Sequence, residues 1–372
     1  MKRKRIMFVF GTRPEAIKLC PLVLELKKRE SLEVIVTVTG QHRQMLDQVM
    51  EIFNIKPDYD LNIMKDKQTL FDITVNILNG IKDILEKAMP DVVLVHGDTT
   101  TAFVSALACF YLKIPVGHVE AGLRTYDLNN PYPEEFNREA IGIVSKFNFS
   151  PTHLAAENLL KEGKNPHSIY ITGNTVIDAM HHTVSDGFDH PELKWIGDNK
   201  LIFITAHRRE NLGEPMHNMF RAIRRVLEEF PDCKAIYPIH MNPMVREIAD
   251  MELKECDNIH IIEPLDVVAC HNFEARSYLC LTDSGGIQEE CPSYGVPVLV
   301  MRNTTERPEG IDAGTLKLVG TSESSIYEAF KLLLENNDEY KKMSNACNPY
   351  GDGHACERIA DILEGKDYTP FQ

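Results

Sequence analysis

Short apolar runs rich in β-branched residues alternate along the chain with longer stretches whose apolar residues recur at helical spacing. In the first half, the runs predict strands at Ile6–Phe10, Val34–Thr39, Val92–His96, Val116–Val119, Phe147–Ser150 and Ile169–Thr172. A second series predicts strands at Leu201–Thr205, Ala235–Pro238, His260–Ile262, Tyr278–Thr282 and Val298–Met301. The helices predicted between them include Glu15–Lys28, Gln68–Lys87, Thr100–Tyr111, Met216–Phe230 and Pro243–Met251. Strands that alternate with helices indicate parallel sheets.

The two series are separated by a polar, weakly periodic segment, 185–199, which is typical of a linker. We therefore expect an α/β protein of two doubly wound, Rossmann-like domains, spanning 1–184 and 200–354. A last helix within 355–372 is expected to return to the first domain. Because parallel sheets bind ligands outside the carboxyl ends of their strands, we expect a site in an interdomain cleft that can close.

Size and composition narrow the choice of function. A chain of 372 residues with 43% hydrophobic and 26% charged residues is ordinary for two globular domains. Its net charge of −15 argues against nucleic-acid binding. Nine cysteines without a C-x-x-C pair indicate reduced thiols and a cytoplasmic location. The basic opening is followed by an apolar run too short for a signal peptide, and we expect no membrane span.

The segment 283–290 follows a predicted strand and contains Ser-Gly-Gly at 284–286. A strand that opens directly into a helix there points unpaired N–H groups outward, which suits a phosphate. Glycine lets the backbone approach the anion closely. Glu289 and Glu290, one turn later, could accept hydrogen bonds from ribose hydroxyls. The stretch suggests a nucleoside diphosphate, and a turn that merely needs glycine is the alternative.

Carboxylates follow successive strands of the first series, at Asp98, Glu120 and Glu134. Like charges brought close raise one another's pKa, which yields acids and bases that work near neutral pH. Stacked carboxylates could instead bind a divalent cation. Against that, the same loops carry neutralising arginines: Arg13, Arg124 and Arg138. Simpler roles are also open, since Asp98 could cap a helix and Glu134 could pair with Arg138 one turn away.

Cationic side chains also follow the strands. Arg13 and Lys18 lie near a predicted helix start, where they could meet a phosphate, although surface charge is the alternative. The run 207–209 places a histidine beside two arginines at a strand end, which suits a pyrophosphate. His207 could also donate or carry a proton, whereas a lone histidine such as His240 is more often structural.

Two further polar segments are candidates for ligand contact. Gln41, His42, Arg43 and Gln44 follow the second predicted strand and could contact sugar hydroxyls or phosphate, or simply start a helix. The loop 302–310 is expected to line the cleft. The G-x-G-x-x-G, P-loop, H-E-x-x-H and G-x-S-x-G patterns are missing, so no nicotinamide cofactor, zinc site or hydrolase serine is expected.

Taken in order, these motifs resemble the non-hydrolysing UDP-N-acetylglucosamine 2-epimerases of bacteria and archaea over nearly the whole chain. The resemblance is carried by segments 10–16, 96–99, 118–124, 133–138, 205–211, 282–290 and 304–309. It implies the two-domain glycosyltransferase-B architecture and a homodimer. It also implies reversible inversion at carbon 2 of UDP-N-acetylglucosamine, without a cofactor. The product, UDP-N-acetylmannosamine, supplies bacterial surface polysaccharides.

The resemblance also implies roles for individual residues. The acid/base candidates are Asp98, Glu120 and Glu134, with His207 added to the catalytic set. The residues that would hold the diphosphate are Arg13, Lys18, Arg138, His207, Ser284, Gly285 and Gly286, and Glu290 would hold the ribose. Bacterial members have a second, activating UDP-N-acetylglucosamine site, whose matching positions are Gln41, Gln44, Gln68, Arg209 and His240. One departure is Cys270, where the family usually carries an aromatic residue near the uracil.

Three other functions remain open from the sequence. A hydrolysing relative would release UDP and free N-acetylmannosamine. A glycosyltransferase of the same architecture would need an acceptor. A UDP-sugar sensor would bind the ligand without turnover, although the presence of all three carboxylates argues against it.

Overall fold

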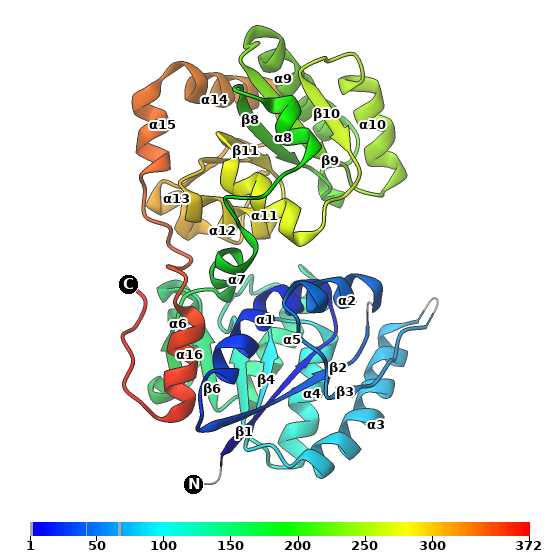
Figure 1. Cartoon of the computed structure of the whole chain (residues 1–372), viewed down its shortest axis with the longest axis vertical. Coiled ribbons are helices and arrows are strands. Elements are labelled where there is room, and N and C mark those ends of the chain that lie inside the picture. The colour runs from blue at the N-terminus through cyan, green and yellow to red at the C-terminus, as the bar shows by residue number, and fades with distance from the viewer. Residues whose placement is uncertain (1–2, 42, 66–67) are drawn as a thin grey trace. The chain divides into compact units, whose positions relative to one another are not determined.

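The computed structural model describes residues 3–41, 43–65 and 68–372, and these form two compact units (Figure 1). The first unit runs up to His182 and also takes up Tyr350–Gln372, while the second is Thr183–Pro349. Within the described residues, no helix is both long and apolar enough to cross a membrane.

The first unit is built on a parallel sheet with the strand order β3-β2-β1-β4-β5-β6-β7. Its strands are β1 (Lys4–Phe10), β2 (Leu32–Val38), β3 (Tyr59–Asp60), β4 (Val92–His96), β5 (Val116–Val119), β6 (Phe147–Ser150) and β7 (Ile169–Ile171). Ile6–Phe10 is fully buried, as expected for a central strand covered on both faces. The chain adds strands on one side of β1 and then on the other, so β1 and β4 form the switch point where such sheets bind ligands.

Helices cover both faces of this sheet. They are α1 (Arg13–Lys27), α2 (Arg43–Ile52), α3 (Leu70–Ala88), α4 (Thr100–Tyr111), α5 (Glu134–Val144), α6 (His153–Lys161), α7 (Thr175–Thr183) and α16 (Ala355–Glu364). Figure 1 shows α16 beside α1, although the two are far apart in sequence. Arg29, just after α1, forms ion pairs with Asp361 and Glu364 and so ties the C-terminal helix to the first unit.

The second unit has a parallel sheet with the strand order β10-β9-β8-β11-β12-β13. Its strands are β8 (Lys200–Thr205), β9 (Cys233–Pro238), β10 (Ile259–Ile262), β11 (Leu279–Thr282), β12 (Val298–Val300) and β13 (Leu316–Leu318). Its helices are α8 (Pro191–Ile196), α9 (Glu214–Glu229), α10 (Pro243–Leu253), α11 (Val267–Arg276), α12 (Gly285–Glu290), α13 (Pro308–Ala313), α14 (Glu323–Glu335) and α15 (Asn337–Ser344). A core between the sheet and α9 includes Phe220, Ile223 and Tyr237.

The α/β class and the two parallel sheets are confirmed, and the predicted strands fall within two residues of those observed. The short edge strands β3 and β13 were missed, because two or three residues carry too little periodicity to be recognised. The segment 185–199, predicted to be a linker, contains α8 and is grouped with the second unit.

Candidate active site

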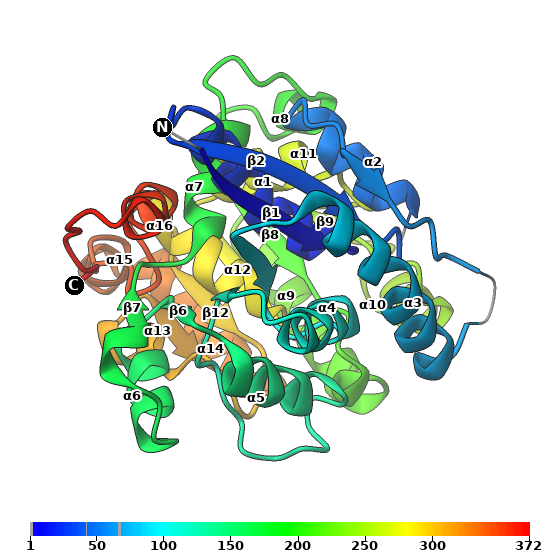
Figure 2. The same ribbon diagram turned by 90° about the horizontal axis from the view of Figure 1, so that it is seen from below.

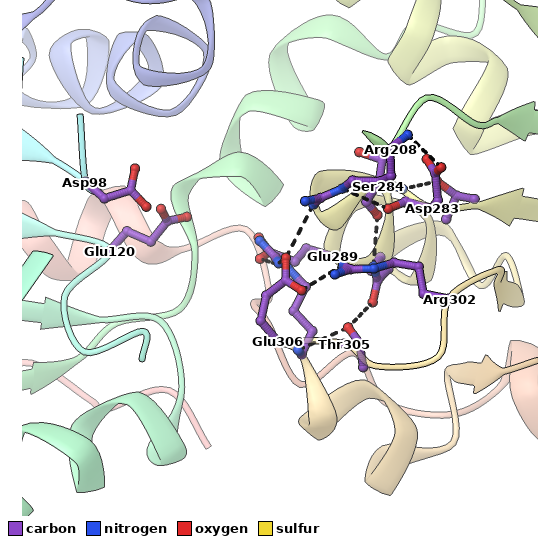
Figure 3. A network of polar contacts seen from close by, with 12 residues as sticks. Asp98, Glu120, Arg208, Asp283, Ser284, Glu289, Arg302, Thr305 and Glu306 are labelled. Atoms are coloured by element: carbon purple, nitrogen blue, oxygen red, sulfur yellow. Dashed lines mark hydrogen bonds and ion pairs between the residues drawn. The ribbon is translucent and has the colours of Figure 1, made fainter. Parts of the chain in front are cut away.

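Asp98 and Glu120 come together at the carboxyl edge of the first sheet. β4 and β5 pair in parallel with His96 opposite Val119, so the residues that follow both strands emerge side by side. Figure 3 shows the carboxyl groups of Asp98 and Glu120 turned toward each other. The backbone of Glu120 has φ of 66°, a left-handed conformation that residues other than glycine rarely adopt. Such strain is concentrated at functional sites.

The Glu120 carboxylate is enclosed by polar partners, and its side chain is only 9% exposed. Lys18, from α1, donates to Oε1, and Nδ2 of Asn174 donates to the same oxygen over 3.1 Å. Nε2 of His96 lies 3.8 Å from Oε2. Lys18 therefore neutralises Glu120 in this structure and would have to exchange that contact for a phosphate if a ligand bound there.

Asp98 is bonded to Arg138 of α5, which also donates to Oε2 of Glu135 over 3.2 Å. The Glu134–Arg138 salt bridge, which the sequence left open as a simpler role, does not form. Arg138 turns toward Asp98 and the fully buried Glu135, while the half-buried side chain of Glu134 makes no hydrogen bond within the described part of the chain. The structure brings Asp98 and Glu120 together but gives no such contact for Glu134.

Glu135 is a residue that the sequence analysis did not single out. Its Oε1 accepts hydrogen bonds from the backbone N–H groups of Thr125 and Tyr126, each at 2.8 Å. Its other oxygen accepts from Arg138. Glu135 thus fixes both the loop after β5 and the arginine that holds Asp98. Only its place next to Glu134 at the start of a helix could have indicated it.

Two buried histidines lie behind these carboxylates, and both are held neutral. Burial lowers the pKa of His96 to about 4, although Glu120 opposes the shift. Burial likewise lowers the pKa of His118 to about 3, and its Nε2 donates to the carbonyl of Gly97 over 2.7 Å. Because His96 is neutral, Lys18 is the main cation that pairs with Glu120.

Glu15 is a second residue that the sequence analysis did not assign. It lies in the first turn of α1 and is 1% exposed. Its Oε2 accepts from the N–H groups of Gly11 and Thr12 at 3.0 and 2.9 Å, and its Oε1 accepts from the Thr99 hydroxyl. Burial raises its pKa to about 7, although these hydrogen bonds oppose the rise. Glu15 ties the loop that carries Arg13 to the loop that carries Asp98.

In the second unit, Asp283 organises the loop that carries His207. The carboxylate is fully buried and accepts from the N–H groups of His207 and Arg208 and from Nδ2 of Asn211, over 2.9 to 3.1 Å. Burial lowers the pKa of His207, Asp283 opposes this, and His240 and Arg208 reinforce it. The His207 and His240 rings stack, with centroids 5.3 Å apart.

A network of cations and carboxylates lies beside the Ser-Gly-Gly turn (Figure 3). Glu306 accepts from Arg302 at 2.7 Å, from Arg307 at 2.9 Å and from Arg208 at 3.4 Å. Burial acts to raise the pKa of Glu306, but Arg307, Arg302 and Arg208 together lower it to about 2. Arg307 also bonds the buried Glu289 over 2.6 Å. Three guanidinium groups are thus held at this turn. The sequence analysis had singled out Arg208 by itself, and Arg302 and Arg307 only as members of the loop 302–310.

The Ser-Gly-Gly turn opens α12, a helix of only six residues. The dipole of so short a helix contributes less to binding an anion than the sequence analysis expected.

Close packing explains why both positions in the turn are glycine. An ideal Cβ on Gly285 would lie 2.6 Å from Nη1 of Arg307, and one on Gly286 would lie 3.1 Å from Oε1 of Glu290. The turn therefore has room for the Arg307 and Glu290 side chains only because both residues lack a Cβ.

The residues matched to a second site lie in both units. In the first, Oε1 of Gln41 accepts from Thr101, Gln44 is exposed, and Oε1 of Gln68 is buried without a hydrogen-bond partner within residues 3–41, 43–65 and 68–372. In the second, Arg209 is exposed and His240 is the residue that stacks on His207. His42 lies outside the described residues.

Comparison with known proteins identifies the class. The UDP-N-acetylglucosamine 2-epimerase family profile matches residues 24–364. The chain is 59% identical over 363 residues to the UDP-N-acetylglucosamine 2-epimerase of Bacillus subtilis, covering 98% of this chain and 96% of that one. A crystal structure of the Neisseria meningitidis enzyme bound to UDP-GlcNAc is 47% identical, with a TM-score of 0.89 and coverage of 97% and 100%. The Methanocaldococcus jannaschii enzyme, in complex with UDP-GlcNAc and UDP, is 34% identical, with a TM-score of 0.80 and coverage of 97% and 99%.

The protein is thus a nucleotide-sugar isomerase of glycosyltransferase-B-like fold. More particularly, the chain belongs to the UDP-N-acetylglucosamine 2-epimerase family. The resemblance drawn from its motifs is confirmed. Across the part of the chain that the structure covers, no group of three or more His, Cys, Asp or Glu side chains is arranged to hold a metal ion.

Proposed function

We propose that the protein inverts carbon 2 of UDP-N-acetylglucosamine reversibly, by eliminating UDP and adding it back to the opposite face of 2-acetamidoglucal. The observation that carries this is the pair Asp98 and Glu120 on one sheet edge, each bound to a cation for which a phosphate could compete. Two carboxylates serve the chemistry because one face of the sugar must lose a proton and the other must gain one. Glu134 is the third acid/base candidate.

Elimination is the step that makes this proton transfer feasible. The proton on carbon 2 is not acidic, since no carbonyl lies next to it to hold an anion. Breaking the anomeric C–O bond lets the electrons of the C–H bond form the glucal double bond while UDP leaves with the C–O pair. Cations that stabilise the charge on the leaving diphosphate lower the barrier. In the first unit, the cations that we assign to this role are Arg13, Lys18 and Arg138.

The second unit supplies the groups that hold UDP in this proposal. Gly285 and Gly286 offer backbone N–H groups to the diphosphate, and Ser284 offers its hydroxyl, because its N–H is bonded to Oγ1 of Thr282 over 2.8 Å. His207 is a donor or proton carrier, and Glu290 binds the ribose. The guanidinium of Arg307, packed against Gly285, supports the same assignment. Cys270 stands where the family usually has an aromatic residue, so stacking on uracil would have to come from elsewhere.

The test is to incubate the protein with UDP-N-acetylglucosamine in heavy water and follow carbon 2 by NMR. We expect a mixture of two nucleotide sugars, both with deuterium at carbon 2. Release of UDP in stoichiometric amount with free N-acetylmannosamine would instead identify a hydrolysing epimerase. Binding without exchange would identify a sensor, and turnover that depends on an added acceptor would identify a glycosyltransferase.

We also propose that UDP-N-acetylglucosamine activates the protein at a second site formed from Gln41, Gln44, Gln68, Arg209 and His240. Contacts inside each unit support a connection between these residues and the proposed active site. In the first unit, an ideal Cβ on Gly11 would lie 3.3 Å from Cβ of Gln41, so this glutamine packs against the turn that precedes Arg13. In the second unit, the stacked His240 contacts His207 directly. Ligand held by these residues would bias the loops that carry the catalytic groups.

A homodimer is the assembly that we propose, with the first unit as the contact surface. Exposed apolar side chains gather on α3, α4 and α5, which lie next to one another (Figure 2). They include Phe71, Val75, Phe110, Tyr111, Phe136 and Ile143, which are between 48% and 85% exposed. Exposed apolar side chains gathered on neighbouring helices are typical of protein interfaces. All nine cysteines are free thiols, which supports a reducing, cytoplasmic location. Surface polysaccharide synthesis is the use that we propose for the product.

A further inference from the structure

We propose that Glu274 is a positioning residue that stays protonated and donates a hydrogen bond to Glu290, holding the Glu290 carboxylate ready for the ribose. This extends the proposed function, because it rests on Glu290 as the ribose contact. Glu274 belongs to no motif of the sequence analysis. It lies on α11, sixteen positions before Glu290 at the end of α12, and both belong to the second unit.

The surroundings of Glu274 require a proton on its carboxyl group. The side chain is 0% exposed. Its Oε1 accepts from Sγ of Cys270 over 3.0 Å. Its Oε2 is buried and has no N–H or hydroxyl partner among the described residues, while the carboxyl group of Glu290 is its neighbour. Two carboxylates cannot bond each other unless one of them carries a proton.

The proton belongs on Glu274 and not on Glu290, because Glu274 is the more deeply buried of the two. Burial raises the pKa of Glu274 well above its ordinary value, and Glu290 and Cys291 raise it further. Cys280 is hydrogen-bonded to Cys291 in the same cluster, and burial raises the pKa of both thiols, so both stay neutral and neither offsets a charge on Glu274. Glu290, in contrast, is partly exposed to solvent. A shared proton therefore resides on Glu274 and leaves the charge on Glu290.

Glu290 is held from its other side by the Ser-Gly-Gly turn. Its Oε1 lies 3.1 Å from the position that a Cβ on Gly286 would occupy. The Glu290 carboxylate is thus confined between Gly286 and Glu274, at the turn proposed to bind the diphosphate. One bond from Glu274 would fix the rotation of the Glu290 carboxylate, whose two oxygens together can accept several hydrogen bonds, including those from a ribose diol.

The test compares the affinity for UDP with that for 2′-deoxy-UDP, which lacks one ribose hydroxyl. In the unchanged protein, we expect UDP to bind about tenfold more tightly or better, because a hydrogen bond to a carboxylate is lost in the analogue. Glu274→Met keeps the volume but removes the donor, and buried apolar replacements of this kind usually fold. We expect this variant to lose most of the discrimination, with KM raised and kcat changed little. Glu274→Gln keeps a donor toward Glu290 and should restore the discrimination.

A purely structural role for Glu274 would lower the affinity for UDP and 2′-deoxy-UDP equally, and that result would overturn the proposal. Loss of discrimination in Glu274→Gln as well would also overturn it. If Glu274→Met fails to fold, Gly286→Ala tests the same point, since its Cβ would push the Glu290 carboxylate away from the turn. If the ribose assignment itself is wrong, the unchanged protein will not discriminate and Glu290→Ala will have no effect on the ratio.

Discussion

The guanidinium of Arg138 bonds the carboxylate of Asp98, forty positions earlier in the chain. The bond joins the first half of α5 to the loop after β4. A second bond from Arg138 to the buried Glu135 fixes the arginine. Arg138 therefore orients Asp98 and could give up this contact when a ligand binds. Such an arrangement suits an acid/base group that meets an anionic substrate.

Replacing Asp98 with Asn should abolish epimerisation while UDP binding is kept. The amide is nearly isosteric and its oxygen can still accept from Arg138, but it cannot carry a proton at neutral pH. We expect kcat to fall by about 10²- to 10⁴-fold, the usual range for a lost general acid or base. NMR of carbon 2 exchange measures kcat, and calorimetry measures UDP affinity. The exposed Asp367→Asn is the matched control, and a variant that loses UDP binding together with its fold would remove the support for a catalytic role.

Gln44→Ala should weaken activation by UDP-N-acetylglucosamine more than catalysis itself. Gln44 is exposed on α2, so the substitution has little effect on packing. We expect the initial-rate curve against substrate to lose its sigmoidal shape while UDP affinity at the active site is unchanged. Gln48→Ala, an equally exposed glutamine on the same helix, is the control. Sigmoidal kinetics that persist in Gln44→Ala would count against the second site.

Gly285→Ala should weaken UDP binding by displacing Arg307. The added Cβ would lie 2.6 Å from Nη1 and 2.9 Å from Cζ of Arg307, which Glu289 and Glu306 hold in place. We expect a loss of about 1–3 kcal/mol in stability, typical of overpacking, together with reduced UDP affinity. Thermal unfolding and calorimetry measure the two effects. Gly187→Ala should change neither, because its Cβ would meet Oγ of Ser185 at 3.9 Å, an ordinary van der Waals distance. Normal UDP affinity in Gly285→Ala would argue against this turn as the diphosphate site.

Glu15 should make the first unit less stable as pH rises. Its pKa is raised to about 7 in the folded protein from 4.5, so the folded chain binds more protons than the unfolded chain between these values. The free energy of unfolding should therefore fall by about 3 kcal/mol as pH rises from 4.5 to 7, and level off above. Glu15→Gln should remove this dependence, which urea unfolding at several pH values would measure. The exposed Glu30→Gln should keep it; identical pH profiles for Glu15→Gln and the unchanged protein would contradict the assignment.

Ile143→Asp should convert the proposed dimer into a monomer. Ile143 is 73% exposed on α5, where a charge costs little in the monomer but would be buried in the interface. Light scattering should give a mass of 42.3 kDa for the variant and twice that for the unchanged protein. Met251→Asp, at a side chain 62% exposed on α10, should remain dimeric. A monomeric unchanged protein would refute the proposed assembly.

Short-range patterns were enough to identify most of the elements of the fold, with β3, β13 and α8 as the exceptions already described. The apolar run of β4 and the helical spacing of α4 predict their observed bounds, because both signals lie within one segment. The place of Asp98 and Glu120 after neighbouring strands also follows, since parallel strands deliver their carboxyl ends to one edge. The same reasoning fails for Arg138, whose expected partner one turn away was Glu134. The partner that it takes instead lies forty positions distant, and no local spacing encodes that choice.

The sequence by itself determined the alternation of strands and helices, the loops that carry the polar motifs and the family. Only the tertiary structure decided which carboxylates form ion pairs, which are buried away from water and which carry a proton. Glu15, Glu135 and Glu274 look like ordinary surface residues in the sequence, yet all three are buried. The physical reason is that burial and charge pairing depend on contacts between segments distant in the chain, and those contacts set the free energy of every ionised group.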